Sequence, residues 1–213
     1  MKAANRALQI WWFLADTLVP PSEEHVLVRE LASLASHLAV RCHEDGVVTL
    51  MAFHDPVVRA VIHEAKFAGN TKAWRLLGEV LAAYITATYP GRAVRIIPMP
   101  LSGARLRSRG YNQVAMVLKE ALPHMPQAVH TRGMLRRADT APQTTLGKTE
   151  RQHNVRGVFA KQWFAPKVPK GDAPETVYML LDDVLTTGAT MHEAKKTLRK
   201  VYGITPQLLA LAH

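Results

Sequence analysis

The spacing of hydrophobic residues predicts a chain in which strands and helices alternate. Leu27, Leu31 and Leu34 recur at helical spacing, whereas the apolar run 176–181 has the length and composition of a buried strand. The pattern predicts helices over residues 5–17, 23–40, 56–67, 71–89, 113–122 and 189–202, and strands over residues 47–53, 93–99, 133–137, 176–181 and 206–212. Such alternation favours the α/β class, with a parallel sheet covered by helices on both faces.

The composition is that of a globular protein with one sizeable core. The chain has 213 residues, of which 48% are hydrophobic. Cys42 is its one cysteine, which excludes an intrachain disulfide and a Cys-rich zinc module and fits a reducing cytoplasm. The apolar run 8–15 is too short to span a bilayer. We therefore expect a cytoplasmic protein with no membrane span; a secretory signal and an interfacial helix are the alternatives for this run.

The net charge of +10 is concentrated in the middle of the chain. Residues 92–161 hold 13 Lys and Arg against three Asp and Glu, and the charges of the other residues balance. A positive field concentrated in this way attracts polyanions such as pyrophosphate, nucleotides or nucleic acid. The charge alone does not choose among these ligands, and a solvated basic face is the alternative.

The segment 182–190 has the features of a site for a sugar 5-phosphate. A hydrophobic strand ends in Asp182 and Asp183, and the run 186–190, TTGAT, then opens a helix. The free N–H groups and the positive dipole end of a helix N-terminus favour a phosphate, and Gly188 lets the backbone approach it closely. The two carboxylates lie one short loop away, where they can accept hydrogen bonds from sugar hydroxyls and help to hold Mg²⁺.

A simpler interpretation is that the aspartates only end a strand and the threonines only cap a helix. Each residue alone favours it, but the combination of two acids and TTGAT is more specific. Neither the G-x-x-x-x-G-K-[ST] of a P-loop nor the G-x-G-x-x-G of a dinucleotide-binding fold occurs in the chain. In open α/β sheets ligands bind beyond the carboxyl ends of the strands, where we expect both this segment and the Arg-rich loop after Pro100.

Residues 180–190, LLDDVLTTGAT, resemble the motif with which type I phosphoribosyltransferases bind phosphoribosyl pyrophosphate (PRPP). Three further blocks narrow the resemblance to the ComF-like competence family. Residues 97–113 are similar to its "PVPL…R…RGFNQ" block, residues 143–159 to its "Q…L…R…N…F" block, and residues 58–69 to its "LR…I…K(F/Y)…G" helix. The resemblance covers about residues 50–212 and implies a type I phosphoribosyltransferase-like parallel sheet flanked by helices.

The N-terminal part departs from that family. ComF-like proteins commonly begin with a short helix that ends in an L-x-P segment, followed by a Cys-rich zinc module. Residues 18–20 match the end of that helix, but residues 22–24 contain no cysteine where the module would begin. Cys42 with the histidines of this region is a poor tetrahedral set, so we expect no zinc site. We predict an N-terminal helical region over residues 1–46 in place of the zinc module, and a phosphoribosyltransferase-type domain over residues 47–213.

The resemblance also implies roles for individual residues. Asp182 and Asp183 would be the catalytic pair and would hold Mg²⁺ together with the substrate, because transfer from PRPP develops positive charge on the ribose and releases pyrophosphate. The residues implied for the 5-phosphate are Thr186, Thr187, Gly188, Ala189 and Thr190. The residues implied for the pyrophosphate are Leu101, Ser102, Arg105, Arg107 and Arg109. Leu101 and Ser102 would donate backbone N–H groups, and the three arginines would add positive charge. The alternative is that the arginines lie in a solvated loop.

A candidate lid lies in the polar segment 143–154, which lacks hydrophobic periodicity. Its candidate residues are Gln143, Lys148, Arg151 and Asn154, and the alternative is an ordinary surface loop. Lys66 ends a predicted helix and is interpreted as a complement to the helix dipole. Asn112 is interpreted as a helix cap, and Trp74 as a core residue.

Two classes of function follow. The first is a Mg²⁺-dependent phosphoribosyltransferase, a glycosyltransferase, that acts on an unidentified acceptor and is linked through its family to natural competence and DNA uptake. The second is a non-catalytic protein that uses the same fold to sense PRPP or a nucleotide, or to bind DNA. Besides PRPP and the acceptor, the partners implied by the resemblance are single-stranded DNA, a competence helicase and a second copy in a homodimer.

Overall fold

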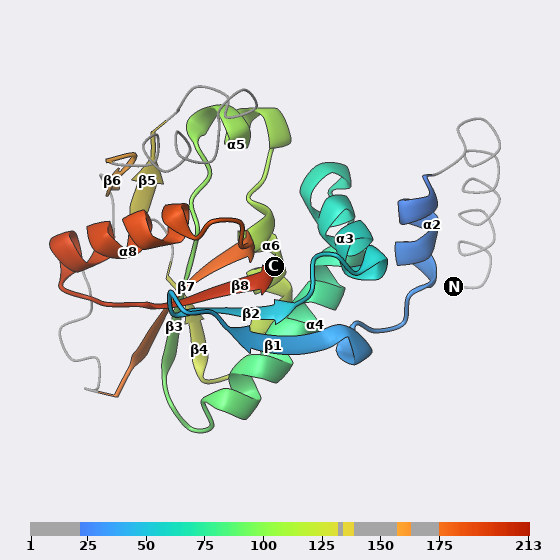
Figure 1. Ribbon diagram of the computed structural model, residues 1–213, viewed down its shortest axis with the longest axis horizontal. Coiled ribbons are helices and arrows are strands. Elements are labelled where there is room, and N and C mark those ends of the chain that lie inside the picture. The colour runs from blue at the N-terminus through green and yellow to red at the C-terminus, as the bar shows by residue number, and fades with distance from the viewer. Residues whose placement is uncertain (1–21, 132–133, 139–156, 163–174) are drawn as a thin grey trace.

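The structure is a computed structural model that describes residues 22–131, 134–138, 157–162 and 175–213 (Figure 1). Its helical segments are α2 (Glu23–Glu30), η1 (Ala35–His37), α3 (Pro56–His63), the π-helix η2 (Glu64–Ala68), α4 (Thr71–Thr88), α5 (Gly103–Arg109), α6 (Gln113–Ala121), η3 (Leu122–His124) and α8 (Ala189–Tyr202). Its strands are β1 (Leu38–Cys42), β2 (Val47–Met51), β3 (Val94–Pro98), β4 (Ala128–His130), β5 (Leu135–Arg137), β6 (Phe159–Lys161), β7 (Val177–Val184) and β8 (Gln207–Ala212).

A six-stranded sheet forms the centre of the protein. Its strand order is β1-β2-β8-β7-β3-β4, and all neighbours are parallel except β1 and β2, which are antiparallel. β5 and β6 form a separate antiparallel pair. The α/β prediction is confirmed: the protein has a mostly parallel sheet flanked by helices, as in a phosphoribosyltransferase-like fold.

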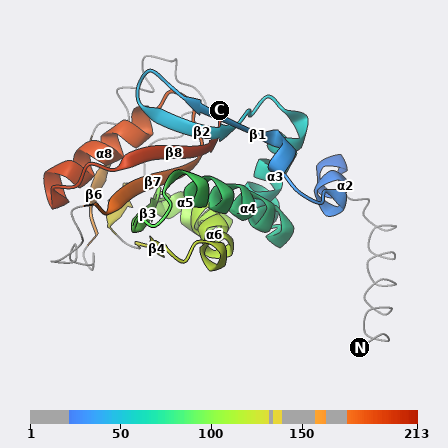
Figure 2. The same ribbon diagram turned by 90° about the horizontal axis from the view of Figure 1, so that it is seen from below.

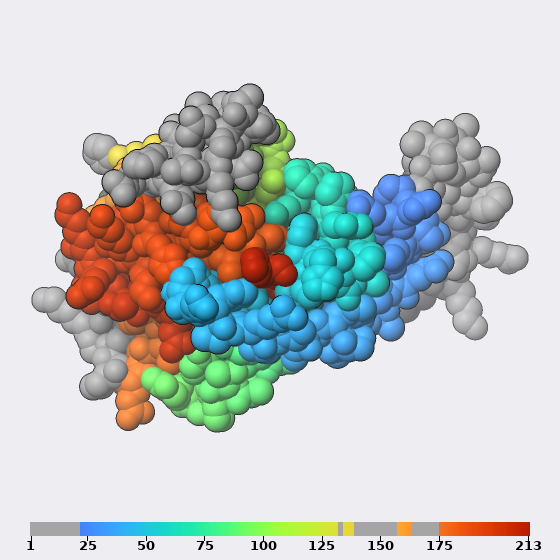
Figure 3. Space-filling model, in the orientation of Figure 1, coloured from blue at the N-terminus to red at the C-terminus, as the bar shows by residue number. Residues whose placement is uncertain are grey.

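Alternating side chains on the strands build a core on each face of the sheet. On β7, Met179 and Leu181 point into the core that α3, α4 and α6 cover, while Leu180 points into the core that α8, β5 and β6 cover. This period of two is the normal geometry of a strand, and a strand buried on both faces is apolar at every position. Figure 2 shows α8 on one face and α4 and α6 on the other. The chain ends between these layers, since His213 exchanges backbone hydrogen bonds with Met51 and Phe53 (Figure 3).

The N-terminal helix is shorter than predicted. The helix expected over residues 23–40 is wrong beyond Glu30, because Leu31 is already extended and residues 38–42 form β1. The helical spacing of the leucines predicts that the helix continues, but residues 38–42 pair with β2 as a strand instead. The expected division between residues 46 and 47 falls at the end of the turn that joins β1 to β2, and it stays a prediction. The helix expected over residues 5–17 lies outside the described residues.

Three pairs of histidine and carboxylate hold the segment 22–37 against α3 and η2. His25 contacts Glu64 at 2.8 Å and His37 contacts Asp55 at 2.7 Å. In the third pair, His63 of α3 contacts Glu24 of α2 at 2.7 Å. Glu64 is only 4% exposed, so its hydrogen bonds offset the cost of burying a carboxylate. These contacts position the first turn of η2, which carries part of the site described below.

Further differences from the sequence prediction lie near the carboxyl ends of β3 and β7. The Arg-rich segment after Pro100, expected to be a loop, contains α5, which Ser102 caps by accepting a hydrogen bond from the Arg105 N–H. β7 continues past Leu181 to Val184, so the two aspartates belong to the strand itself.

The predicted strand at 133–137 is confirmed as β5 over residues 135–137. Among the described helices, none combines the length and the apolar character needed to cross a membrane.

A close approach of α4 and α6 generates a test of the fold. A Cβ atom at Gly78 would lie 3.0 Å from the Ala121 nitrogen and 3.1 Å from the Val117 oxygen. We expect Gly78→Ala to lower the free energy of unfolding by about 1–2 kcal/mol, because overpacking against backbone outweighs the gain of about 1 kcal/mol in helix propensity. Chemical denaturation measures the change.

The exposed Ala83 on the same helix provides the control. Ala83→Gly should cost about 1 kcal/mol from propensity alone. If Gly78→Ala instead stabilised the protein by a similar amount, α4 and α6 would not be in such close contact.

Candidate functional site

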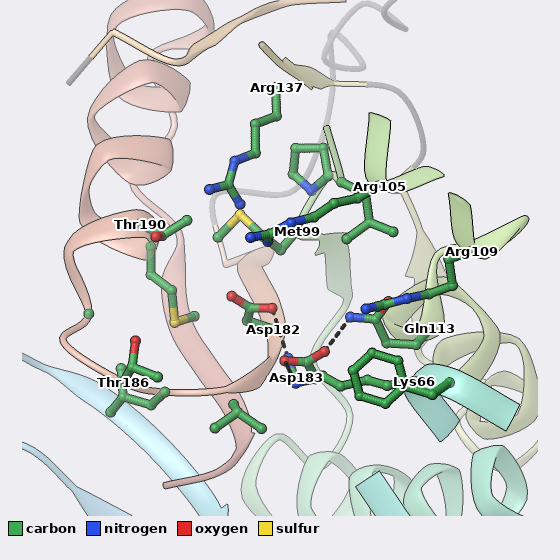
Figure 4. Close-up of a pocket in the computed structure, with 17 residues that line it drawn as sticks. Lys66, Met99, Arg105, Arg109, Gln113, Arg137, Asp182, Asp183, Thr186 and Thr190 are labelled. Carbon is green, nitrogen blue, oxygen red and sulfur yellow. Dashed lines mark hydrogen bonds and ion pairs between the residues drawn. The ribbon is translucent and has the colours of Figure 1, made fainter. Parts of the chain in front are cut away.

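A cavity of about 470 Å³ lies at the carboxyl ends of the neighbouring strands β3 and β7. Four parts of the chain form its walls: η2, the region of α5 and α6, β5, and the segment from the end of β7 to the start of α8. Figure 4 shows Asp182 and Asp183 in the middle, with arginines on one side and Thr186 and Thr190 on the other. A site at this edge of the sheet is where open α/β folds bind ligands.

Asp183 is a buried carboxylate with two compensating partners. Its side chain is 11% exposed; Lys66 Nζ lies 3.0 Å from Oδ1, and Gln113 Nε2 donates a hydrogen bond to Oδ2. Gln113 in turn accepts a hydrogen bond from the guanidinium of Arg109. Because the lysine comes from η2 and the amide from α6, Asp183 joins two helices to the strand. The ion pair and the hydrogen bond offset the cost of burying this carboxylate.

Asp182 has a different environment, although it is the next residue. Its Oδ1 accepts a hydrogen bond from the Asp183 N–H at 2.9 Å. Burial, and next the negative charge of Asp183, raise the pKa of Asp182 to about 7, against the opposing effects of Lys66 and Arg137. A bound cation, or a hydrogen bond from a sugar hydroxyl, would stabilise the ionised form of this carboxylate.

Arg105 and Arg137 form a positive wall above the aspartates (Figure 4). Burial, and next the charge of Arg105, hold the pKa of Arg137 below its usual value, which means that the two guanidinium groups repel each other. The Nε atom of Arg137 is buried and has no hydrogen-bond partner among the described residues. A buried donor without a partner beside a second guanidinium is an arrangement that an anion would satisfy.

The segment 186–190 forms the opposite wall. Gly188 precedes α8 with φ +71°, and no side chain of the described residues caps the helix, so its first N–H groups are available to a ligand. A side chain at Gly188 would strain the backbone because φ is positive, and its Cβ, 2.6 Å from Asp45 Oδ2, would also force the Asp45 side chain to move. Asp45, in the turn between β1 and β2, accepts a hydrogen bond from His192 at 3.0 Å and so holds this turn against α8.

The structure brings together eight of the twelve predicted site residues that it describes. The predicted residues that line the cavity are Leu101, Arg105, Arg109, Asp182, Asp183, Thr186, Gly188 and Thr190. Ser102, Arg107, Thr187 and Ala189 do not line it: Ser102 caps α5, and Thr187 lines a second hollow beside the β1–β2 turn. The predicted lid residues Gln143, Lys148, Arg151 and Asn154 lie outside the described residues. The roles assigned to all of these residues stay predictions.

Sequence reasoning missed several residues that shape the site. These are Lys66, Phe67, Gln113 and Arg137. The first three lie in blocks that resemble the ComF-like family, and that resemblance was the available signal. Lys66 was interpreted as a partner of the helix dipole, whereas its ammonium group contacts Asp183. Nothing in the local pattern around Arg137 indicated that this side chain, and not that of Arg136, would point into the cavity.

The chain is similar in sequence to two competence proteins. No family model matches it. It is 35% identical over 107 residues to Competence protein F of Haemophilus influenzae, a match that covers 50% of this chain and 44% of the relative. It is 27% identical over 148 residues to Competence protein ComFC of Bacillus subtilis, covering 68% of this chain and 55% of the relative. These relatives support the resemblance to the ComF-like family. The chain spans about half the length of the curated relatives it matches.

The same residues bear on metal binding. Within the parts of the chain that the structure describes, no three His, Cys, Asp or Glu side chains cluster closely enough to hold a metal ion by themselves. The expectation that there is no zinc site stays a prediction. Asp182 and Asp183 offer the oxygen ligands that Mg²⁺ prefers. Among the described residues, no cation lies as close to Asp182 as Lys66 lies to Asp183, so the donor set fits Mg²⁺ shared with a ligand.

The raised pKa of Asp182 makes stability depend on pH. Between the ordinary value of 3.8 and about 7, the folded protein keeps a proton that the unfolded chain releases, so the free energy of unfolding falls as pH rises through this window. We expect Asp182→Asn to remove this loss, and to stabilise the protein at pH 8 by roughly 2 kcal/mol more than at pH 4. Thermal unfolding at the two pH values, without added Mg²⁺, measures the difference.

Glu79→Gln, on the exposed face of α4, is the control and should shift stability by a similar small amount at both pH values. An Asp182→Asn variant that gains nothing at pH 8 would show that burial of this carboxylate carries no cost.

Proposed function

We propose that this ComF-like protein binds PRPP with Mg²⁺ in the cavity and transfers the phosphoribosyl group to an acceptor. The observation that carries the proposal is the order of charges across the cavity. The uncapped start of α8 lies on one side, two carboxylates lie in the middle, and two guanidinium groups lie on the other side. PRPP has the same order: a phosphate, a ribose with hydroxyl groups, and a diphosphate.

Each wall would hold one part of this ligand. The N–H groups at the start of α8, with the hydroxyls of Thr186 and Thr190, suit the 5-phosphate. Asp182 and Asp183 suit the ribose hydroxyls, for which carboxylate oxygens are acceptors. Arg105 and Arg137 suit the diphosphate, because guanidinium groups form paired hydrogen bonds with phosphate oxygens. The diphosphate would also give the Arg137 Nε a partner and remove the repulsion between the two arginines.

The transfer depends on stabilising the charges that develop as the C1–O bond breaks. The arginines would hold the departing diphosphate, and the carboxylates lie where positive charge develops on the ribose. Mg²⁺, when bound with the diphosphate and the oxygens of Asp182 and Asp183, would supply further neutralisation of the leaving group. Lys66 and Gln113 would keep Asp183 oriented for this task. The segment 143–154 stays the predicted lid.

The names of the relatives support a proposal about the process that this protein serves. Both relatives are named as competence proteins. We therefore propose that the phosphoribosyl transfer serves natural competence, the uptake of DNA by bacteria.

Arg137 provides a sharp test, because the next residue on the same strand is a matched control. Arg137 lines the cavity, whereas Arg136 is exposed on the opposite side of β5. We expect Arg137→Gln to weaken PRPP binding about 10- to 100-fold, the loss of one set of charge-assisted hydrogen bonds, and Arg136→Gln to leave it within about twofold. Calorimetric titration of PRPP with Mg²⁺ measures both. Equal effects in the two variants would contradict the assignment.

Dependence on Mg²⁺ is a separate test that uses the carboxylates. PRPP binding to the unaltered protein should weaken at least about tenfold when Mg²⁺ is replaced by a chelator, and Asp182→Asn should lose most of this difference. Binding that is saturable but indifferent to both changes would show that the carboxylates do not take part. No binding of PRPP at all to the folded protein would overturn the proposed function.

A further inference from the structure

A small recess opens beside the main cavity, between η2 and α5. Its volume is about 220 Å³, and its lining residues are Lys66, Phe67, Arg105, Ser108 and Arg109. All of these except Ser108 also line the main cavity, so the two spaces share a wall. A molecule in the recess would therefore lie against the ligand in the cavity.

The ring of Phe67 is the most unusual feature of this recess. It is 65% exposed, the largest exposed fraction among the large hydrophobic side chains of the described residues. The ring is nevertheless held in place, because the His63 ring lies 4.8 Å from it and the Arg109 guanidinium 5.1 Å from its centroid. An aromatic ring that is both oriented and open to solvent is a surface on which a flat molecule can stack.

The charge of the recess is positive. Its lining includes one lysine and two arginines and no carboxylate. Lys66 is already paired with Asp183, but Arg109 donates to the neutral amide of Gln113, and neither arginine forms an ion pair within the described part of the chain. The recess therefore offers uncompensated guanidinium groups next to an open aromatic face, which favours an anion over a neutral molecule.

We propose that this recess is the acceptor subsite, and that the acceptor is a flat aromatic compound with a negative charge, such as an aromatic carboxylate. The ring of the acceptor stacks on Phe67, and its anionic group pairs with Arg109. This inference rests on the proposed function, since it supplies the missing second substrate of the same reaction. It also gives Arg109, expected from the sequence to bind pyrophosphate, a different partner.

The placement of the recess suits the transfer. In Figure 4, Lys66 and Arg137 lie on opposite sides of the two aspartates. A nucleophile from the side of Lys66 and a leaving group held on the side of Arg137 flank the ribose between them. The lone pair of the acceptor forms the new bond to C1, the C1–O electron pair leaves with the diphosphate, and a proton carried by the nucleophile passes to water.

The test compares three probes on the full chain with PRPP and Mg²⁺ present, so that the arginines of the diphosphate wall are occupied. The probes are 2-aminobenzoate, the neutral 2-aminobenzamide and the non-aromatic cyclohexanecarboxylate. We expect 2-aminobenzoate to bind at least about tenfold more tightly than either of the others, because it alone has both the ring and the charge. Calorimetry measures all three, and the release of pyrophosphate shows whether a bound probe also reacts.

Four variants separate stacking, charge and indirect effects. Phe67→Leu should weaken 2-aminobenzoate about tenfold, while Phe67→Tyr keeps the ring and stays within about twofold. Arg109→Gln should remove most of the preference for 2-aminobenzoate over 2-aminobenzamide. Val129→Ala alters another exposed hydrophobic residue, on β4 and outside the recess, and should change nothing. Titration of PRPP alone into each variant shows whether the main cavity is still formed.

The outcomes distinguish this inference from the proposed function. If PRPP binds but the three probes bind alike, or if Phe67→Leu binds 2-aminobenzoate as tightly as the unaltered chain, the acceptor subsite is overturned and the PRPP site stands. If a short oligothymidylate binds through Phe67 while 2-aminobenzoate does not, the recess serves nucleic acid and the acceptor assignment is wrong. If PRPP itself fails to bind, both proposals fall.

Discussion

The site depends on the compensation of one buried carboxylate. Burying the charge of Asp183 would cost several kcal/mol if it had no partner. Lys66 and Gln113 provide the compensation from two different helices, and Arg109 and Phe67 extend the chain of contacts until it returns to η2 beside Lys66. This closed circuit holds β7, α5, α6 and η2 in a fixed relation, so the walls of the cavity are placed by its charges as well as by the hydrophobic core.

The same circuit makes two adjacent aspartates unequal. The side chains of a strand alternate, so Asp182 and Asp183 point to different sides of β7, and only Asp183 faces the lysine. The compensated carboxylate serves as an anchor for the surrounding helices. For the other, burial, and next the negative charge of Asp183, raise the pKa to about 7. The positive wall is unbalanced in the same way, because Arg105 and Arg137 face each other. A ligand that carries anionic groups together with a cation would relieve both imbalances.

Much of the fold could be predicted from local pattern because each strand and its flanking helices carry their own signals. The apolar run that became β7 and the Gly188 that precedes α8 are such signals. β1 could not be predicted, because its residues are all exposed and it exists through pairing with β2, which the leucine spacing before it conceals. In the site, the acids and threonines on either side of one turn were identifiable because they are neighbours in the chain. Lys66 and Arg137 were not, because only the packing of η2 and of the β5–β6 pair brings them to the cavity.

The π-helical turn η2 has an evolutionary consequence. A π-helix arises where a helix holds one residue more than regular α-helical hydrogen bonding accommodates, and such turns are frequent at functional sites. Here that turn presents two consecutive side chains, Lys66 and Phe67, to the same cavity. Loss of a single codon within it would restore a regular α-helix and turn these side chains away from Asp183 and from Arg109. A single insertion or deletion can therefore add or remove the contribution of Lys66 and Phe67 to the site, without a series of point substitutions.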